Sequence, residues 1–155
     1  MLNLKVMMFA CLSVTAVFCE NDQKRYNSNT ESCLLETNMS RDEFQAMLAT
    51  ENDSQLVILK TQAHKCMFGC MMRKNHIINN GIVSVDVLNA YVLNFYGTSD
   101  YKRRLISKKV EQVVDICTKK DNLPTEECAL AGILIPCIAV EANKAGLADE
   151  YPEQP

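Results

Sequence analysis

Eight cysteines restrict how this chain can fold more than any other feature of its sequence. Cys11 and Cys19 lie in an apolar N-terminal segment, and an even set of six follows: Cys33, Cys66, Cys70, Cys117, Cys128 and Cys137. Six cysteines favour three disulfides in an oxidising compartment. A metal site would need thiolates grouped in short loops, whereas these are spread along the chain with two histidines, His64 and His76. We therefore expect disulfides, with no metal and no cofactor.

The N-terminal segment has the layout of a secretory signal peptide. Lys5 precedes an apolar run that ends at Cys19, and the chain becomes polar from Glu20 onward. The run is shorter than the roughly 20 residues that span a bilayer, which favours cleavage after Cys19 over a permanent membrane anchor. We expect residues 1–19 to be the signal peptide and residues 20–155 to be one secreted domain without stable membrane insertion.

Charge argues against nucleic acid as a partner. Removal of residues 1–19 takes away one lysine and no acid, so the net charge changes from −3 to −4. The basic clusters at 102–104 and 119–120 lie in otherwise balanced segments, which is typical of solvated helix faces. A domain of this length buries roughly two thirds of its unfolded surface, enough for a core with space for a ligand.

Apolar residues recur at intervals of three and four along most of the chain, which is the pattern of amphipathic helices. Leu88, Val92 and Phe95 show it in one segment, and no segment alternates with a period of two. We expect an all-α fold of about six helices and no sheet. The expected helices span residues 24–36, 40–49, 55–76, 84–96, 100–119 and 125–145.

Local signals mark where these helices begin and where they are interrupted. Ser40 followed by Glu43, and Thr125 followed by two acids, predict helix N-termini. The dipeptide at 80–81, Asn-Gly, predicts a join between helices. Pro136 removes a backbone donor inside the last helix, so it predicts a kink there or a break near Ile135.

Helix geometry narrows the choice of disulfides without settling it. Six cysteines allow fifteen complete pairings. Cys66 and Cys70 lie one turn apart with nearly parallel side chains, and Cys128 and Cys137 are about 13 Å apart along one helix, so neither pair is a good partner. Excluding both leaves ten pairings. In each of them Cys66 and Cys70 tie the third helix to other parts of the chain, a frame that would resist the collapse of an internal cavity.

The cysteine order resembles that of the pheromone- and general-odorant-binding proteins of insects. Three residues between Cys66 and Cys70, and eight between Cys128 and Cys137, are the most specific part of the resemblance. It implies six helices around an internal apolar cavity, and a carrier that transports small hydrophobic molecules, such as odorants or pheromones, through chemosensory lymph or another secreted fluid to a receptor. It also implies the disulfides Cys33–Cys70, Cys66–Cys128 and Cys117–Cys137.

Candidate ligand-binding residues come from the apolar helix faces, and each could equally be ordinary core. Methionine adapts to irregular shapes and suits a permissive pocket. The apolar candidates are Met67, Met71, Ile82, Val83, Leu88, Val92, Val113, Val114 and Ile133. Asn75 and Tyr91 are the candidate hydrogen-bonding groups for an alcohol, aldehyde or ester. The tail at 146–155, which includes Tyr151, is a candidate lid over the pocket. Protonation of its acidic residues or of His76 at low pH would loosen such a lid. A frayed terminus is the alternative.

Other functions have less support in the sequence. No serine or cysteine comes with a recognisable base, so we do not expect an enzyme. A secreted helical interaction protein, such as an inhibitor or effector without cargo, is the main alternative, and it would have a filled core. A carrier of charged amines would need a carboxylate inside the pocket, and the predicted apolar helix faces contain no acid in a suitable position. A homodimer stays open. Asn38 and Asn52 are candidate glycosylation sites, with Asn52 preferred because we expect it in a loop.

Overall fold

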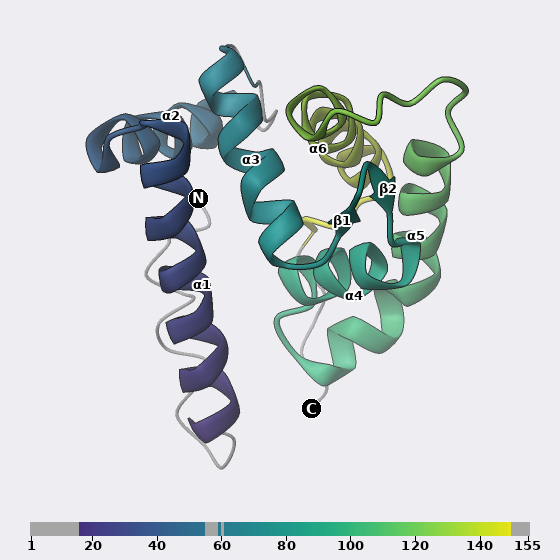
Figure 1. Cartoon of the computed structure of the whole chain (residues 1–155). Helices are drawn as coiled ribbons and strands as arrows, with labels where there is room; N and C mark the ends of the chain where they lie inside the picture. The colour runs from purple at the N-terminus through teal and green to yellow at the C-terminus, as the bar shows by residue number, and fades with distance from the viewer. Residues whose placement is uncertain (1–15, 55–58, 60, 150–155) are drawn as a thin grey trace.

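The computed structural model describes residues 16–54, 59 and 61–149, and this part of the chain is all-α with one short hairpin. Figure 1 shows the order of its elements along the chain. They are α1 (Ala16–Thr37), α2 (Arg41–Ser54), α3 (Gln62–Lys74), β1 (Ile78–Asn79), β2 (Ile82–Val83), α4 (Val85–Tyr96), α5 (Asp100–Thr118) and α6 (Glu127–Lys144). The predicted fold class is therefore confirmed. No helix in the described part of the chain has both the length and the apolar content that crossing a bilayer requires.

Helix α3 lies between α1 and α6, and α5 packs against both α4 and α6 (Figure 1). Three disulfides hold this arrangement. One joins α1 to α3, the second joins α3 to α6 and the third joins α5 to α6, and this is the pairing that the resemblance implies: Cys33–Cys70, Cys66–Cys128 and Cys117–Cys137. Cysteines therefore bind α1, α3, α5 and α6 together, whereas α2 and α4 contain none.

Caps explain two helix starts that the sequence prediction misplaced. Helix α3 begins at Gln62 and not at 55, because the Thr61 hydroxyl accepts a hydrogen bond from the His64 N–H at 3.2 Å. Helix α6 is capped by Glu126 and not by Thr125. The Glu126 carboxylate accepts from the backbone N–H groups of the two residues that follow Glu127, at 3.0 and 2.7 Å. Helix α2 also runs beyond its predicted end at 49.

The expectation of no sheet is wrong at one place. Strands β1 and β2 pair antiparallel, with Ile78 opposite Val83 and Asn79 opposite Ile82. The turn between them has positive φ at both central residues, 51° at Asn80 and 75° at Gly81. Asn-Gly is the dipeptide best suited to such a two-residue hairpin turn, since both residues tolerate the left-handed region. The sequence signal was present at 80–81, but it predicted only a join.

Helix α6 continues through Pro136, so the predicted break near Ile135 is wrong. Leu134 and Ile138 on either side of the proline are buried, and Cys137 is bonded to Cys117 of α5. Packing and the disulfide therefore hold the helix across a position where the chain lacks one backbone donor.

Helix α2 begins with the predicted capping box. The Glu43 N–H donates to the Ser40 hydroxyl at 3.1 Å, and the Ser40 N–H donates to the Glu43 carboxylate at 2.8 Å. The hydrogen bond from the Ser40 backbone lowers the pKa of Glu43 below its usual range. A carboxyl group whose pKa is lower in the folded state stabilises the fold above its unfolded pKa, and this stability is lost as pH falls through the folded value.

We therefore expect Glu43→Gln to remove part of the acid sensitivity of the fold. The melting temperature of the variant should fall less than that of the wild type when pH is lowered from neutral into the range where carboxylates titrate. Ser40→Gly removes the hydroxyl that accepts from the Glu43 N–H but keeps the backbone N–H that donates to the Glu43 carboxylate, and it serves as the matched control. Parallel melting curves for Glu43→Gln and the wild type across this pH range would contradict the assignment.

The buried side chains of the described residues form two apolar clusters. We call the set contributed by the end of α3, the hairpin and helices α4, α5 and α6 the first cluster. The set contributed by α1, the α1–α2 turn, α2 and α3 is the second cluster. Phe68 of α3 is half-buried and packs against both. Leu147 closes the end of α6 by packing, fully buried, into the first cluster, and its N–H donates to the Ala142 carbonyl at 3.0 Å.

Candidate ligand-binding site

Four of the predicted ligand-binding residues come together in the first cluster. Leu88 and Val92 from α4, and Val113 and Val114 from α5, are all almost completely buried. They share the cluster with aliphatic residues of α6, including Leu130 and Leu134. Val83 of the hairpin is half-buried and packs against the same cluster. This apolar core between three helices is the candidate site.

The two predicted methionines lie elsewhere. Met67 and Met71 are buried in the second cluster, among residues of α1 and α2. The sequence prediction assumed one lining, whereas the structure divides it between two clusters that share Phe68. A single helix can do this because α3 is covered by α1 on one side and by α6 on the other, so its apolar residues face two partners.

Three predicted residues are exposed, to different extents. Ile82 is 71% exposed. Successive pairs along the hairpin face opposite sides, so the pair of Asn79 and Ile82 points away from the core while the pair of Ile78 and Val83 points inward. Ile133 is 38% exposed and Tyr91 is 40% exposed. None of the three contributes to the first cluster, so the structure does not bring them together with the other candidates. Tyr151 lies outside the described residues, as does the rest of the tail beyond 149.

The polar groups also differ from those predicted. Asn75 ends α3, and its side-chain amide is already engaged: it donates to the Met71 carbonyl at 2.8 Å and accepts from Asn29 at 3.3 Å. Asn89 of α4 was not predicted. Its side-chain oxygen is buried and has no hydrogen-bond partner among the described residues. The sequence could have indicated Asn89 as a candidate, since it lies three residues before Val92 and therefore on the buried side of the helix.

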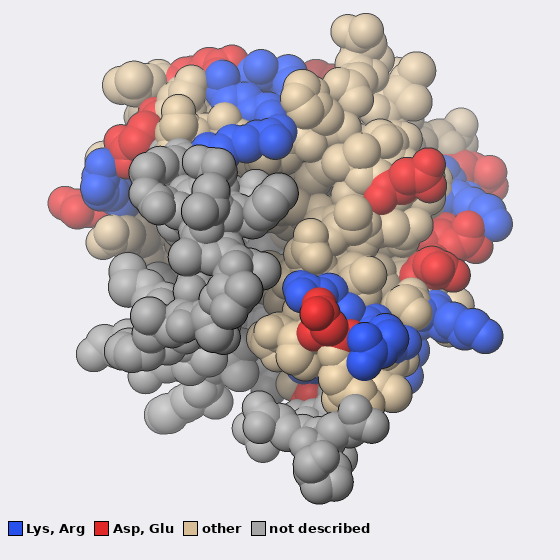
Figure 2. Space-filling model, turned by 90° about the horizontal axis from the view of Figure 1, so that it is seen from below, with Lys and Arg blue, Asp and Glu red and all other residues tan. Residues whose placement is uncertain are grey.

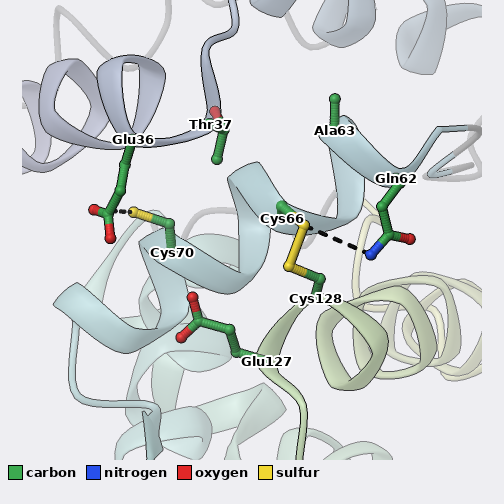
Figure 3. Close-up of a pocket in the computed structure, with 8 residues that line it drawn as sticks. All are labelled: Glu36, Thr37, Gln62, Ala63, Cys66, Cys70, Glu127 and Cys128. Atoms are coloured by element: carbon green, nitrogen blue, oxygen red, sulfur yellow. Dashed lines mark hydrogen bonds between the residues drawn. A yellow bond between two sulfur atoms is a disulfide. The ribbon is translucent and has the colours of Figure 1, made fainter.

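Two hollows stand out at the surface, and neither contains a predicted lining residue. The larger, about 390 Å³, lies where α1, α3 and the start of α6 meet (Figure 3). Arg73 spans this junction by pairing with Glu36 of α1 and, at 2.9 Å, with Glu127 of α6. The smaller, about 260 Å³, lies at the turn between α1 and α2. The larger hollow is lined by the polar side chains of Glu36, Gln62 and Glu127 among others, and the first cluster consists of apolar side chains.

One group of side chains at this junction has the composition of a metal site. The sulfurs of Cys33 and Cys70 and a carboxylate oxygen of Glu36 lie within 4.8 Å of one another. Both sulfurs are bonded to each other, however, so neither is a thiolate that could bind a metal ion. The 3.2 Å approach of the Cys70 sulfur to Glu36, drawn in Figure 3, is a contact, since a disulfide sulfur has no proton to donate. This donor set does not fit a metal.

Charged side chains of both signs lie at the surface, and the two glycosylation candidates lie at or within helices. On the face shown in Figure 2, basic and acidic side chains are mixed around a wide area of uncharged residues. Asn38 is exposed at the end of α1 with φ of 52°. Asn52 falls within α2 and not in a loop, so the structural reason for preferring it is lost.

In the described part of the chain, six helices are held by three disulfides around an aliphatic core, which defines a small, disulfide-bonded helical protein. The model of the PBP/GOBP family, the pheromone- and general-odorant-binding proteins, matches residues 15–141, and the chain belongs to this family. The solved structure of odorant-binding protein dmelOBP28a from Drosophila melanogaster is similar, with a TM-score of 0.65 and 22% identity over 83% of this chain and 98% of that one. Among curated protein sequences, none is significantly similar to this chain.

Proposed function

We propose that this protein is a secreted, non-enzymatic carrier that holds a small hydrophobic molecule within the first cluster and moves it through extracellular fluid to a receptor. Removal of residues 1–19 would release the mature domain. The observation that carries the proposal is the enclosed aliphatic core of α4, α5 and α6 in a member of the odorant-binding family. Burial of apolar ligand surface among such side chains is favourable by about 25 cal/mol per Å².

The distribution of disulfides supports an entry route at α4. A molecule can enter a packed core only if one of the enclosing elements moves, and α5 and α6 are cross-linked to each other through Cys117 and Cys137. Helix α4 contains no cysteine and contributes Leu88 and Val92 to the cluster. We infer that α4 shifts to admit the ligand while the cross-linked helices stay in place.

A pair of alanine variants tests whether the first cluster is the site. Leu88→Ala deletes buried apolar atoms from it and should weaken binding of a hydrophobic fluorescent probe by about fivefold, the effect of roughly one lost methylene contact. Ile82→Ala deletes the same number of carbon atoms from a side chain that is 71% exposed, and should leave affinity unchanged. Equal affinities for both variants and the wild type would place the probe elsewhere.

A further inference from the structure

The side-chain amide of Asn89, beside the first cluster, has an unusual environment for a polar group. Asn89 is half-buried in the middle of α4, and one turn further along the same face lie Val92 and Leu93, which belong to the cluster or pack against it. The side-chain oxygen is buried without a hydrogen-bond partner among the described residues. A buried polar atom left in this state costs about 1–3 kcal/mol of stability, so it calls for an explanation.

The cost is removed if a ligand supplies the missing partner. An amide oxygen accepts hydrogen bonds and cannot donate them, so its partner must carry an N–H or O–H group. A hydrocarbon chain suits the aliphatic residues that flank Asn89, and a single donor at its end would reach the oxygen. We propose that Asn89 is a specificity-determining residue that selects apolar molecules with a hydroxyl group, long-chain alcohols in particular. This proposal rests on the proposed carrier function.

Aldehydes and esters of the same length fit this arrangement less well. Their oxygens only accept hydrogen bonds, so with the amide oriented as in this structure they would leave the Asn89 oxygen without a donor and bury a second acceptor beside it. Pairing such a ligand with the amide N–H groups would require the side chain to turn over. The preference for alcohols therefore has two sources: the hydrogen bond from the hydroxyl to the Asn89 oxygen, and the unfavourable burial of two acceptors when an aldehyde or ester binds. Its size is that of one net hydrogen bond, about fivefold in affinity.

The test compares decanol, decanal and decane as competitors for a fluorescent probe on the oxidised domain, in the wild type and two variants. Asn89→Leu replaces the amide by an apolar group of similar size. Asn94→Leu makes the same change at an exposed position of α4 and is the matched control. The wild type and Asn94→Leu should prefer decanol over decanal by about fivefold, and Asn89→Leu should lose this preference while still binding decane.

Melting temperatures supply a second readout. Because both substitutions exchange asparagine for leucine in the same helix, helix propensity changes equally, and Asn89→Leu should be more stable than Asn94→Leu once the unpartnered atom is removed. A preference for decanol that survives in Asn89→Leu, or a lower melting temperature of Asn89→Leu than of Asn94→Leu, would overturn the proposal. If the wild type takes up neither probe nor competitors, the carrier function itself fails, which is a different result.

Discussion

The double variant Cys66→Ala/Cys128→Ala should lose about 4 kcal/mol of unfolding free energy. This disulfide joins α3 to α6 across 62 residues, the longest of the three closed segments. Cross-linking a longer segment restricts the unfolded chain more, so its removal costs more. Since folded domains are stable by only about 5–15 kcal/mol, the variant should be partly unfolded at moderate temperature.

The matched control is Cys117→Ala/Cys137→Ala, which opens a segment of 20 residues and should lose about 3 kcal/mol. Urea unfolding of both variants and of the wild type, with free thiols counted to confirm that the remaining bridges are formed, measures the difference. A larger loss in the control would contradict the loop-length argument. It would show that the α5–α6 bridge is more important for stability than the α3–α6 bridge.

The second large effect is expected at the crossing of α3 and α6. A Cβ atom added at Gly69 would lie 2.8 Å from the Glu127 carbonyl oxygen and 3.2 Å from the Cys128 nitrogen. Both are backbone atoms beside a disulfide, so they cannot move away without separating the two helices. Gly69→Ala should therefore lose about 2 kcal/mol of unfolding free energy, even though alanine is the better helix former.

Gly132→Ala is the control for this prediction. The added Cβ atom there would meet only the flexible stem of Lys65, at 2.9 Å, and that side chain can move aside. Stability should stay constant or rise by up to about 1 kcal/mol from helix propensity. Thermal and urea unfolding of the two variants measure the contrast. A Gly69→Ala variant as stable as Gly132→Ala would mean that the helices tolerate a wider separation.

The helices were predictable because burial on one face imposes a period of three to four residues. Ser40 and Glu43 also identified their helix start correctly, since a capping box is a local interaction between residues three apart. The start of α3 was not predictable from apolar periodicity, which shows where a helix can form but not where a cap such as Thr61 begins it.

The candidate site was predictable only in part. Leu88, Val92, Val113 and Val114 are apolar on helix faces, and they come together because those faces pack on each other. Met67 and Leu88 lie in separate clusters because different helices cover the two sides of α3. Which helix covers which side is a property of tertiary packing. Ile82 was placed wrongly because its orientation depends on a hairpin register that the prediction did not include.

The proposed carrier function requires that the oxidised domain take up hydrophobic molecules in its core. The most direct measurement is a titration of the mature domain, residues 20–155 with three disulfides verified by mass, with a fluorescent probe that brightens in apolar surroundings. We expect saturable uptake of one probe per protein molecule, displaced by decanol. No uptake by the correctly bridged protein would contradict the carrier function and favour the alternative, a helical interaction protein whose packed core admits no ligand.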